Sequence, residues 1–375
     1  MIRSFDWRDV KLVKTLSEQG VCLDAATGLT HGAHPLQSAL FAYLMPAASA
    51  PTVIWRAPNS HPKNHGPSAA FGQLRHRPGQ ELARVLFVAP PRVPETAEAW
   101  LRVVEQLAVE AGERGAHNLI AEVNEDSAEF EALRTAGFAI YARQSLWKLM
   151  AGGHTQPGAS TKTVALRPGK SSDAIGVSTL YGNIVPRLVQ QVEPPPVRIK
   201  RGYVLEQGSE VIAFLDVRQG PVGIWLEPYL HPEAYDLSEA VLHTCLDLLT
   251  NGNDKPVYVC VRRYQHWLQE IVARAGFQWM GSQAVMVKRL AARITEPLLK
   301  PLTVAEGQVP TPIVNIHNCQ HSAEQVAAPL SSSLLEYWLT QHAKTNYRRS
   351  PCVDGRDSGQ HWGSPQRRQP HRRPA

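Results

Sequence analysis

The sequence predicts two α/β domains in tandem, each a mixed, mostly antiparallel twisted sheet flanked by helices. The main observation is a repeat. Strand-like runs, a helical stretch and an Ala-Gly-Phe triplet recur 139 residues apart, with the triplets at residues 136–138 and 275–277. A period this long indicates a duplicated domain, because the units of a solenoid are roughly 20–50 residues long. A chain of 375 residues with 43% hydrophobic residues is long enough for two buried cores.

Composition divides the chain into four parts. Residues 1–150 and 164–300 are the two predicted domains, and the small, polar residues 151–163 are predicted to link them. Residues 301–375 lose all periodicity and contain eight Lys or Arg against five acids. We expect this basic tail to be mostly disordered, because it has too little apolar surface to form a core.

The elements of the first domain follow from apolar spacing. Helices are predicted over residues 9–19, 99–115 and 127–135, the second from the stripe Trp100, Val104, Leu107 and Ala111. Strands are predicted over residues 53–56, 71–74, 85–88, 119–123 and 138–148. Residues 61–67 are rich in Pro, Asn and Gly and are predicted to form a loop.

The second domain repeats this order. A helix is predicted over residues 173–180, and residues 203–217 read as a hairpin around Gly208. Strand, helix, strand, helix and strand follow through Arg289. Glu193 and the three prolines after it are predicted to form a stiff spacer on the surface.

Several classes of protein are disfavoured by composition. No apolar run approaches the ~18 residues of a membrane span, and the charged N-terminus differs from a signal peptide. The five cysteines are scattered, and Cys245 and Cys260 fall on apolar faces, so we expect reduced thiols and a cytoplasmic protein. Histidine pairs such as His31 and His34 lack a third ligand nearby, and we expect no metal site. The net charge of +6 indicates mild attraction to anions.

The order of these elements is similar to that of the GNAT acyltransferase superfamily. The resemblance covers about residues 1–150 and 164–290. It rests on the hairpin, the strands ending Val88-Ala-Pro and Leu226-Glu-Pro, the long helix after each, and the Ala-Gly-Phe triplets. It implies an acyl-CoA co-substrate whose pantetheine arm lies between two splayed parallel strands. Its pyrophosphate would meet the N–H groups that open the following helix.

Both loops that would bind pyrophosphate depart from the family pattern. In the first, Val93 takes the place of the family's arginine, with Arg92 one residue early, and Thr96 and Glu98 replace glycines. In the second, His231 takes the place of arginine. There, Ala234 and Asp236 replace the glycines; alternatively, Asp236 simply caps the helix. The resemblance places the cofactor at Val88 and Arg92 in the first domain and at Leu226 and His231 in the second.

The family's usual general acid is also missing. The resemblance places a tyrosine four residues before the Gly of Gly-Phe, where this chain has Leu133 and Val272. Neither side chain can transfer a proton. Candidate catalytic residues are therefore Glu122 and Glu227 as bases, with Tyr229 close by.

Two principal functions remain open. The first is an N-acetyltransferase-like enzyme that transfers an acyl group from acetyl-CoA or another acyl-CoA to an amine of a small molecule or protein. The second is a catalytically inactive GNAT-like binding or interaction module, which the loss of both loops would suit. We expect no membrane partner, and nucleic acid only through the basic tail. If one domain keeps an acyl-CoA site, His231 favours the second, because prolines around Arg92 remove N–H donors.

Overall fold

The computed structural model describes residues 1–45, 51–57, 69–153, 164–250 and 254–290. The predicted loop over residues 61–67, most of the predicted linker and the whole predicted tail lie outside these residues. The described residues all fall within one compact unit. Below, the first half means the described residues up to 153, and the second half those from 164 to 290.

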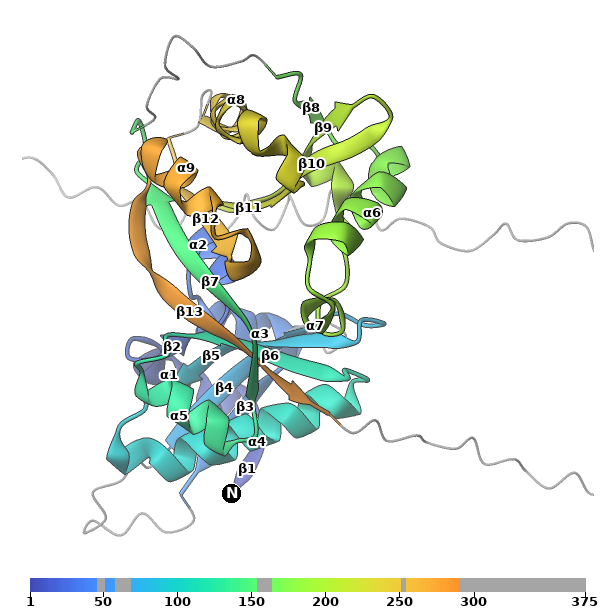
Figure 1. Ribbon diagram of the computed structural model, residues 1–375. Coiled ribbons are helices and arrows are strands. Elements are labelled where there is room, and N and C mark those ends of the chain that lie inside the picture. Colours follow the sequence, from blue (N-terminus) through green and yellow to red (C-terminus); the bar gives the residue numbers. More distant parts are fainter. Residues whose placement is uncertain (46–50, 58–68, 154–163, 251–253, 291–375) are drawn as a thin grey trace, which may run out of the picture. The chain divides into compact units, whose positions relative to one another are not determined.

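The halves contain similar elements in a similar order (Figure 1). The strands of the first half are β1 (Ile2–Ser4), β2 (Val21–Cys22), β3 (Thr52–Arg56), β4 (Ala69–His76), β5 (Leu82–Ala89), β6 (Asn118–Val123) and β7 (Ala139–Leu149). Its helices are η1 (Trp7–Asp9), α1 (Val10–Ser17), α2 (Ala25–His31), α3 (Pro35–Leu44), η2 (Pro94–Thr96), α4 (Ala97–Glu113) and α5 (Ala128–Thr135).

The strands of the second half are β8 (Arg167–Pro168), β9 (Tyr203–Gln207), β10 (Glu210–Gln219), β11 (Ile224–Leu230), β12 (Val257–Arg262) and β13 (Gln278–Arg289). Its helices are η3 (Ser171–Asp173), α6 (Ala174–Ile184), α7 (Arg187–Gln190), η4 (Ile199–Arg201), η5 (Pro232–Leu237), α8 (Ser238–Thr250), η6 (Arg263–Gln265) and α9 (Leu268–Arg274). The predicted mixed, mostly antiparallel sheet with flanking helices is confirmed in both halves.

The two halves exchange their last strands. Within the described residues the strands form one sheet in the order β1-β3-β4-β5-β6-β13-β7-β12-β11-β10-β9-β8, and β2 pairs with β5. Strand β13 of the second half pairs with β6 of the first, and β7 of the first half pairs with β12 of the second. In Figure 1 these two long strands run side by side. Each half therefore depends on the other for its final strand.

The cores follow from the same exchange. The first core packs the predicted stripe of α4, including Trp100 and Leu107, against β3 to β6, and it also contains Ala284 and Met286 from β13. The second core contains α8 and α9 together with Leu149 from β7. Cys245 and Cys260 are buried free thiols, as predicted from their apolar faces. Burial in this shared core couples the stability of the halves.

The Ala-Gly-Phe triplets end helices α5 and α9. Gly137 and Gly276 have φ of +85° and +91°, in the left-handed region that glycine adopts without steric cost. The Phe138 N–H donates to the Leu133 carbonyl at 3.0 Å, and the Phe277 N–H donates to the Val272 carbonyl at 3.3 Å. These bonds form Schellman-type caps and turn each buried phenylalanine into the core.

Each half has one parallel strand pair that separates along its length. Strands β5 and β6 are in register only from Leu82 to Arg84, although β5 continues to Ala89. Strands β11 and β12 are in register only from Ile224 to Leu226, although β11 continues to Leu230. We call these separations the first splay and the second splay. They are where the GNAT resemblance expects the pantetheine arm.

Candidate functional site

The first splay is occupied by the chain's own backbone. Strand β2 pairs with β5 through Val21 and Val88. The Leu23 N–H then donates to the Leu86 carbonyl at 2.9 Å, and the Glu122 N–H donates to the Leu23 carbonyl at 2.9 Å. Leu23 thus bridges both separated strands, and its side chain is 1% exposed. The backbone groups that a pantetheine arm would bind here already have partners.

The predicted base Glu122 holds this inserted segment in place. One carboxylate oxygen accepts from the Ala25 N–H at 2.8 Å, at the start of α2, and the other accepts from Arg84 at 3.1 Å. Burial, followed by the charge of Asp24, raises the pKa of Glu122 above its usual value despite Arg84. The carboxylate is therefore part of the structure that closes the first splay.

The second splay is closed by one side chain. The Gln265 amide accepts from the Leu230 N–H at 3.0 Å and donates to the Pro228 carbonyl at 3.0 Å. Gln265 ends η6, directly after β12, and is 3% exposed. Its amide has a donor and an acceptor side by side, as a peptide group has. It can therefore satisfy both backbone groups of β11 that face the splay.

Glu227 lies on β11 between two arginines. Arg262 Nε donates to it at 3.2 Å and Arg218 Nη2 at 3.4 Å. Burial alone would raise the pKa of Glu227, but Arg262 and Arg218 outweigh burial and hold the pKa below its usual value. A carboxylate stabilised in its charged form is a weaker base than a free one.

Tyr229 lies two residues further along β11, on the same face of the strand. It is buried, and its ring centroid is 5.9 Å from that of Tyr181 and 6.3 Å from that of Phe214. Burial, followed by the charge of Glu227, raises the pKa of Tyr229 well above its usual value. The phenol therefore stays protonated at neutral pH.

The predicted cofactor residues of the first half are bound within the protein. Val88 pairs with β2 on one side and with Gly72 of β4 on the other. Arg92 Nη1 donates to the Val93 carbonyl at 2.8 Å, and the Arg92 N–H donates to Glu129 at 3.3 Å. The Thr96 hydroxyl closes the loop by accepting from the Val93 N–H at 2.8 Å. This loop offers few free donors to a phosphate.

The predicted cofactor residues of the second half are also bound within the protein. Leu226 is fully buried and pairs with Val217 on one side and Val259 on the other. His231 caps η5: its Nδ1 accepts from the Glu233 N–H at 3.4 Å. The His231 N–H donates to the Ile212 carbonyl at 2.9 Å. His231 is therefore a capping residue in this conformation.

A separate cavity of about 360 Å³, which we call the central cavity, lies where the halves meet. Its wall contains six arginines but only two carboxylates. The arginines are Arg75 on β4, Arg77 directly after it, Arg84 on β5, Arg198 and Arg201 around η4, and Arg218 on β10. The carboxylates are Glu193 and Asp216, and Tyr229 also lines the cavity. Of the predicted site residues, only Tyr229 is part of this wall.

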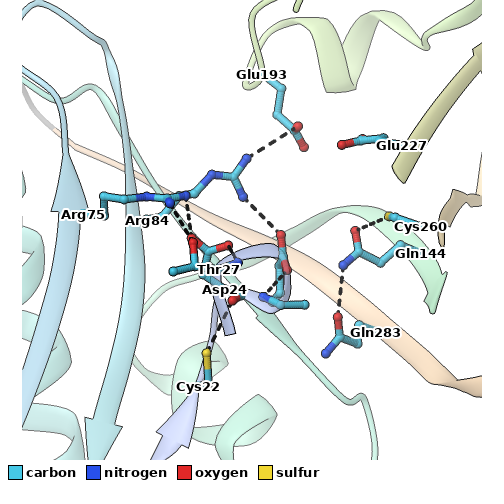
Figure 2. Close-up of polar contacts among 12 residues, drawn as sticks. Cys22, Asp24, Thr27, Arg75, Arg84, Gln144, Glu193, Glu227, Cys260 and Gln283 are labelled. Atoms are coloured by element: carbon cyan, nitrogen blue, oxygen red, sulfur yellow. Dashed lines mark hydrogen bonds and ion pairs between the residues drawn. The ribbon is translucent and has the colours of Figure 1, made fainter. Parts of the chain in front are cut away.

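Ion pairs bind two of the wall arginines. Arg84 lies 3.1 Å from Glu122 and 3.9 Å from Glu193, while Arg75 lies 2.6 Å from Asp24. Figure 2 shows Arg84 directed toward Glu193, with Arg75 beside Asp24 and Thr27. The network thus connects charges of the first half to a carboxylate of the second.

Glu193 was predicted to belong to a surface spacer, but other side chains bind its carboxylate. Arg262 Nη2 donates to both of its oxygens at 3.0 Å, and the Tyr141 hydroxyl donates to it at 2.5 Å. The prolines after it line the cavity. The arginines of the wall were not among the predicted site residues. The available signal was charge inside apolar strands, as at Arg84 of β5 and Arg218 of β10.

The chain is similar in fold to GNAT proteins of known structure. A GCN5-related N-acetyltransferase from Sphaerobacter thermophilus is 11% identical, with 77% of this chain and 95% of that chain covered and a TM-score of 0.49. A tandem GNAT protein from the clavulanic acid biosynthesis pathway is 13% identical, with 77% and 98% covered and a TM-score of 0.45. An acetyltransferase of the GNAT family from Colwellia psychrerythraea is 12% identical, with 77% and 99% covered and a TM-score of 0.40.

No protein-family model matches the sequence, and no curated protein sequence matches it significantly. At these identities and TM-scores, the likenesses concern the arrangement of helices and strands alone. In the part of the chain that the structure describes, no helix is long and apolar enough to cross a membrane.

Proposed function

We propose that this chain is a ligand-binding module built on an acyltransferase-like fold. One observation carries the proposal: Leu23 joins the two strands of the first splay by backbone hydrogen bonds of 2.9 Å each. The bridge replaces what a pantetheine arm would contribute, and Glu122 fixes it from the side. The second splay is also closed, by the Gln265 amide. Binding acyl-CoA at either splay would first require breaking these contacts.

Calorimetry with acetyl-CoA tests this proposal. We expect no binding of acetyl-CoA at a splay: any heat or thermal stabilisation at millimolar acetyl-CoA should be lost when the arginines of the central cavity are replaced. A protein with an intact site gains about 2.7 kcal/mol at a ligand concentration 100 times its dissociation constant. Saturable binding that is unaffected by substitutions in the central cavity would place acetyl-CoA in a splay and overturn the proposal.

The second candidate is an acyl-CoA-dependent N-acyltransferase acting on an amine. It is favoured by one feature of the second half: Gln265 is a side chain, and rotating it would free the Leu230 N–H and the Pro228 carbonyl. The amine nitrogen would attack the thioester carbon, the C–S bond would break, and the thiolate would take a proton from Tyr229. Glu227 or water would take the proton of the amine.

Thiol release from acetyl-CoA with a panel of amines tests the second candidate. An enzyme should lose most of its turnover in Tyr229→Phe, which keeps the ring and removes the proton. Phe214→Tyr is unsuitable as a control because Phe214 is fully buried. Tyr235→Phe is a matched control, since Tyr235 is 51% exposed. No thiol release from the wild-type protein would rule out transfer to the tested amines.

A further inference from the structure

The central cavity contains more positive charge than its own carboxylates neutralise. Arg75, Arg84 and Arg218 have acidic partners at 2.6, 3.1 and 3.2 Å. Among the described residues, no carboxylate lies within ion-pair distance of Arg77, Arg198 or Arg201, although the more distant Asp216 attracts Arg198. These three unpaired arginines come from both halves and line the same cavity.

The unpaired arginines affect one another. Partial burial, followed by the charge of Arg198, lowers the pKa of Arg77 below its usual value. Partial burial, followed by the charge of Arg201, lowers the pKa of Arg198 as well. Arg77, Arg198 and Arg201 are exposed, but they line one cavity and their charges repel one another. An anion bound between them would offset this repulsion.

The arginines that have acidic partners are held in position by those contacts. Arg75 donates to Asp24 and Thr27 at 2.6 Å each, and Arg218 donates to Asp216 at 3.2 Å. A guanidinium has five N–H donors, so each retains donors for a ligand. Arginines fixed by other contacts lose less entropy when they bind an anion.

The cavity has the size and lining of a site for a small molecule. Its volume of about 360 Å³ falls within the ~300–1,000 Å³ of ligand pockets. Its apolar wall includes Leu82, Val197 and the prolines 194–196, with the Tyr229 ring beside them. Guanidinium groups match phosphate and carboxylate oxygens in geometry and charge.

We propose that this cavity binds a small organic polyanion carrying phosphate or carboxylate groups, which bridges Arg77 of the first half and Arg198 of the second. The proposal rests on the function proposed above, that of a binding module, and identifies the class of ligand. The polyanion lies against the arginines, and its organic part packs on the proline wall.

Calorimetry of the full chain in phosphate-free buffer tests this, with tripolyphosphate and citrate as probes. The test variant is Arg77→Gln/Arg198→Gln. The control is Arg102→Gln/Arg134→Gln, which removes the same charge from the exposed faces of α4 and α5. We expect at least one probe to bind with a stoichiometry of one. Affinity should fall at least ~10-fold in the test variant and less than about twofold in the control. The stronger of the two probes shows whether phosphate or carboxylate is preferred.

Three results would overturn the proposal: no binding of either probe, equal losses in the two variants, or tighter binding of a 12-nucleotide single strand that depends on Arg77 and Arg198. The last would assign the cavity to nucleic acid. Acetyl-CoA distinguishes this failure from failure of the binding-module proposal. If acetyl-CoA binds the cavity through its phosphates, its affinity falls in the test variant; if it binds a splay, its affinity does not change.

Discussion

The two halves contain similar elements in a similar order, and their splays differ in how they are closed. In the first, a segment of backbone around Leu23 lies between the strands and bonds to both. In the second, a single amide at Gln265 bonds to one strand. The first closure continues into α2 and the buried core, where Leu23 packs with Val85 and Val123. The second depends on one rotatable side chain.

This difference teaches which half can still change function. Removing the backbone bridge would also remove part of a core, so opening the first splay would cost more than opening the second. A side-chain closure can open at the cost of two hydrogen bonds. We therefore propose that any remaining acyl-CoA site lies in the second half.

The largest effect should come from the first closure. Replacing Leu23 by Ala removes a side chain that is 1% exposed within the first core. Large-to-small changes of this kind cost about 2–5 kcal/mol of the free energy of unfolding. Urea denaturation measures the loss, with Leu188→Ala as a control because Leu188 is 52% exposed. A loss below ~1 kcal/mol in Leu23→Ala would show that the segment around Leu23 is not an integral part of the first half.

The closure of the second half should matter less. Gln265→Ala leaves the Leu230 N–H and the Pro228 carbonyl without their amide partner. A buried polar group without a partner costs about 1–3 kcal/mol. We expect a loss in that range in urea, and little change in Gln191→Ala at an exposed position. If Gln265→Ala cost as much as Leu23→Ala, the contrast between the two closures would be wrong.

The start of each half provides a third comparison. Asp9 is bound by Arg3, and Asp173 by Arg167, each six residues earlier in the chain. Arg167 holds the pKa of Asp173 at about 2, below its ordinary 3.8, because its hydrogen bonds outweigh burial. A depressed pKa stabilises the folded state above the unfolded pKa, and this contribution is lost as the pH falls through the folded pKa.

Asp173→Asn should therefore cost about 1 kcal/mol at pH 7, a typical value for a capping side chain. The difference from wild type should shrink between about pH 4 and pH 2. Urea midpoints measured from pH 7 down to pH 2.5 test this. A difference that stays constant over that range would mean that Asp173 acts through packing, without a charge.

Local signals predicted much of the fold. The stripe of Trp100 and Leu107 predicts α4, because one helix face repeats every three to four residues. The Ala-Gly-Phe triplets mark where α5 and α9 end, since only glycine adopts the required φ at no cost. The hairpin around Gly208 is β9 and β10. Each of these features is determined by residues close together in the chain.

The remaining features depend on distant residues. The segment that closes the first splay was missed because β2 has only two residues and carries no periodicity. The exchange of β7 and β13 was missed because a buried strand has the same pattern whichever neighbour it pairs with. The cavity was not predicted because its arginines are far apart in the sequence, from Arg75 to Arg218. The predicted bases Glu122 and Glu227 are each buried beside charged residues that are distant in the sequence. Only the fold brings those charges close to them.

The smallest effect should occur where the halves meet. Arg77 and Arg198 repel each other and form no close ion pair with an acid among the described residues, so the cavity without ligand carries an electrostatic cost. Arg77→Gln/Arg198→Gln should raise the free energy of unfolding by a few tenths of a kcal/mol, the scale of exposed charge pairs. Salt screens charges over about 10 Å at 0.1 M, and over about 3 Å at 1 M, so the gain should appear at low salt and vanish at 1 M. Paired urea titrations at the two salt concentrations measure it, with Arg102→Gln/Arg134→Gln as the control.

The control should lose stability slightly at low salt, since Arg102 and Arg134 face acids on their own helices. A loss in the cavity variant at low salt would mean that the two arginines stabilise the junction of the halves, and that no anion is needed to balance them.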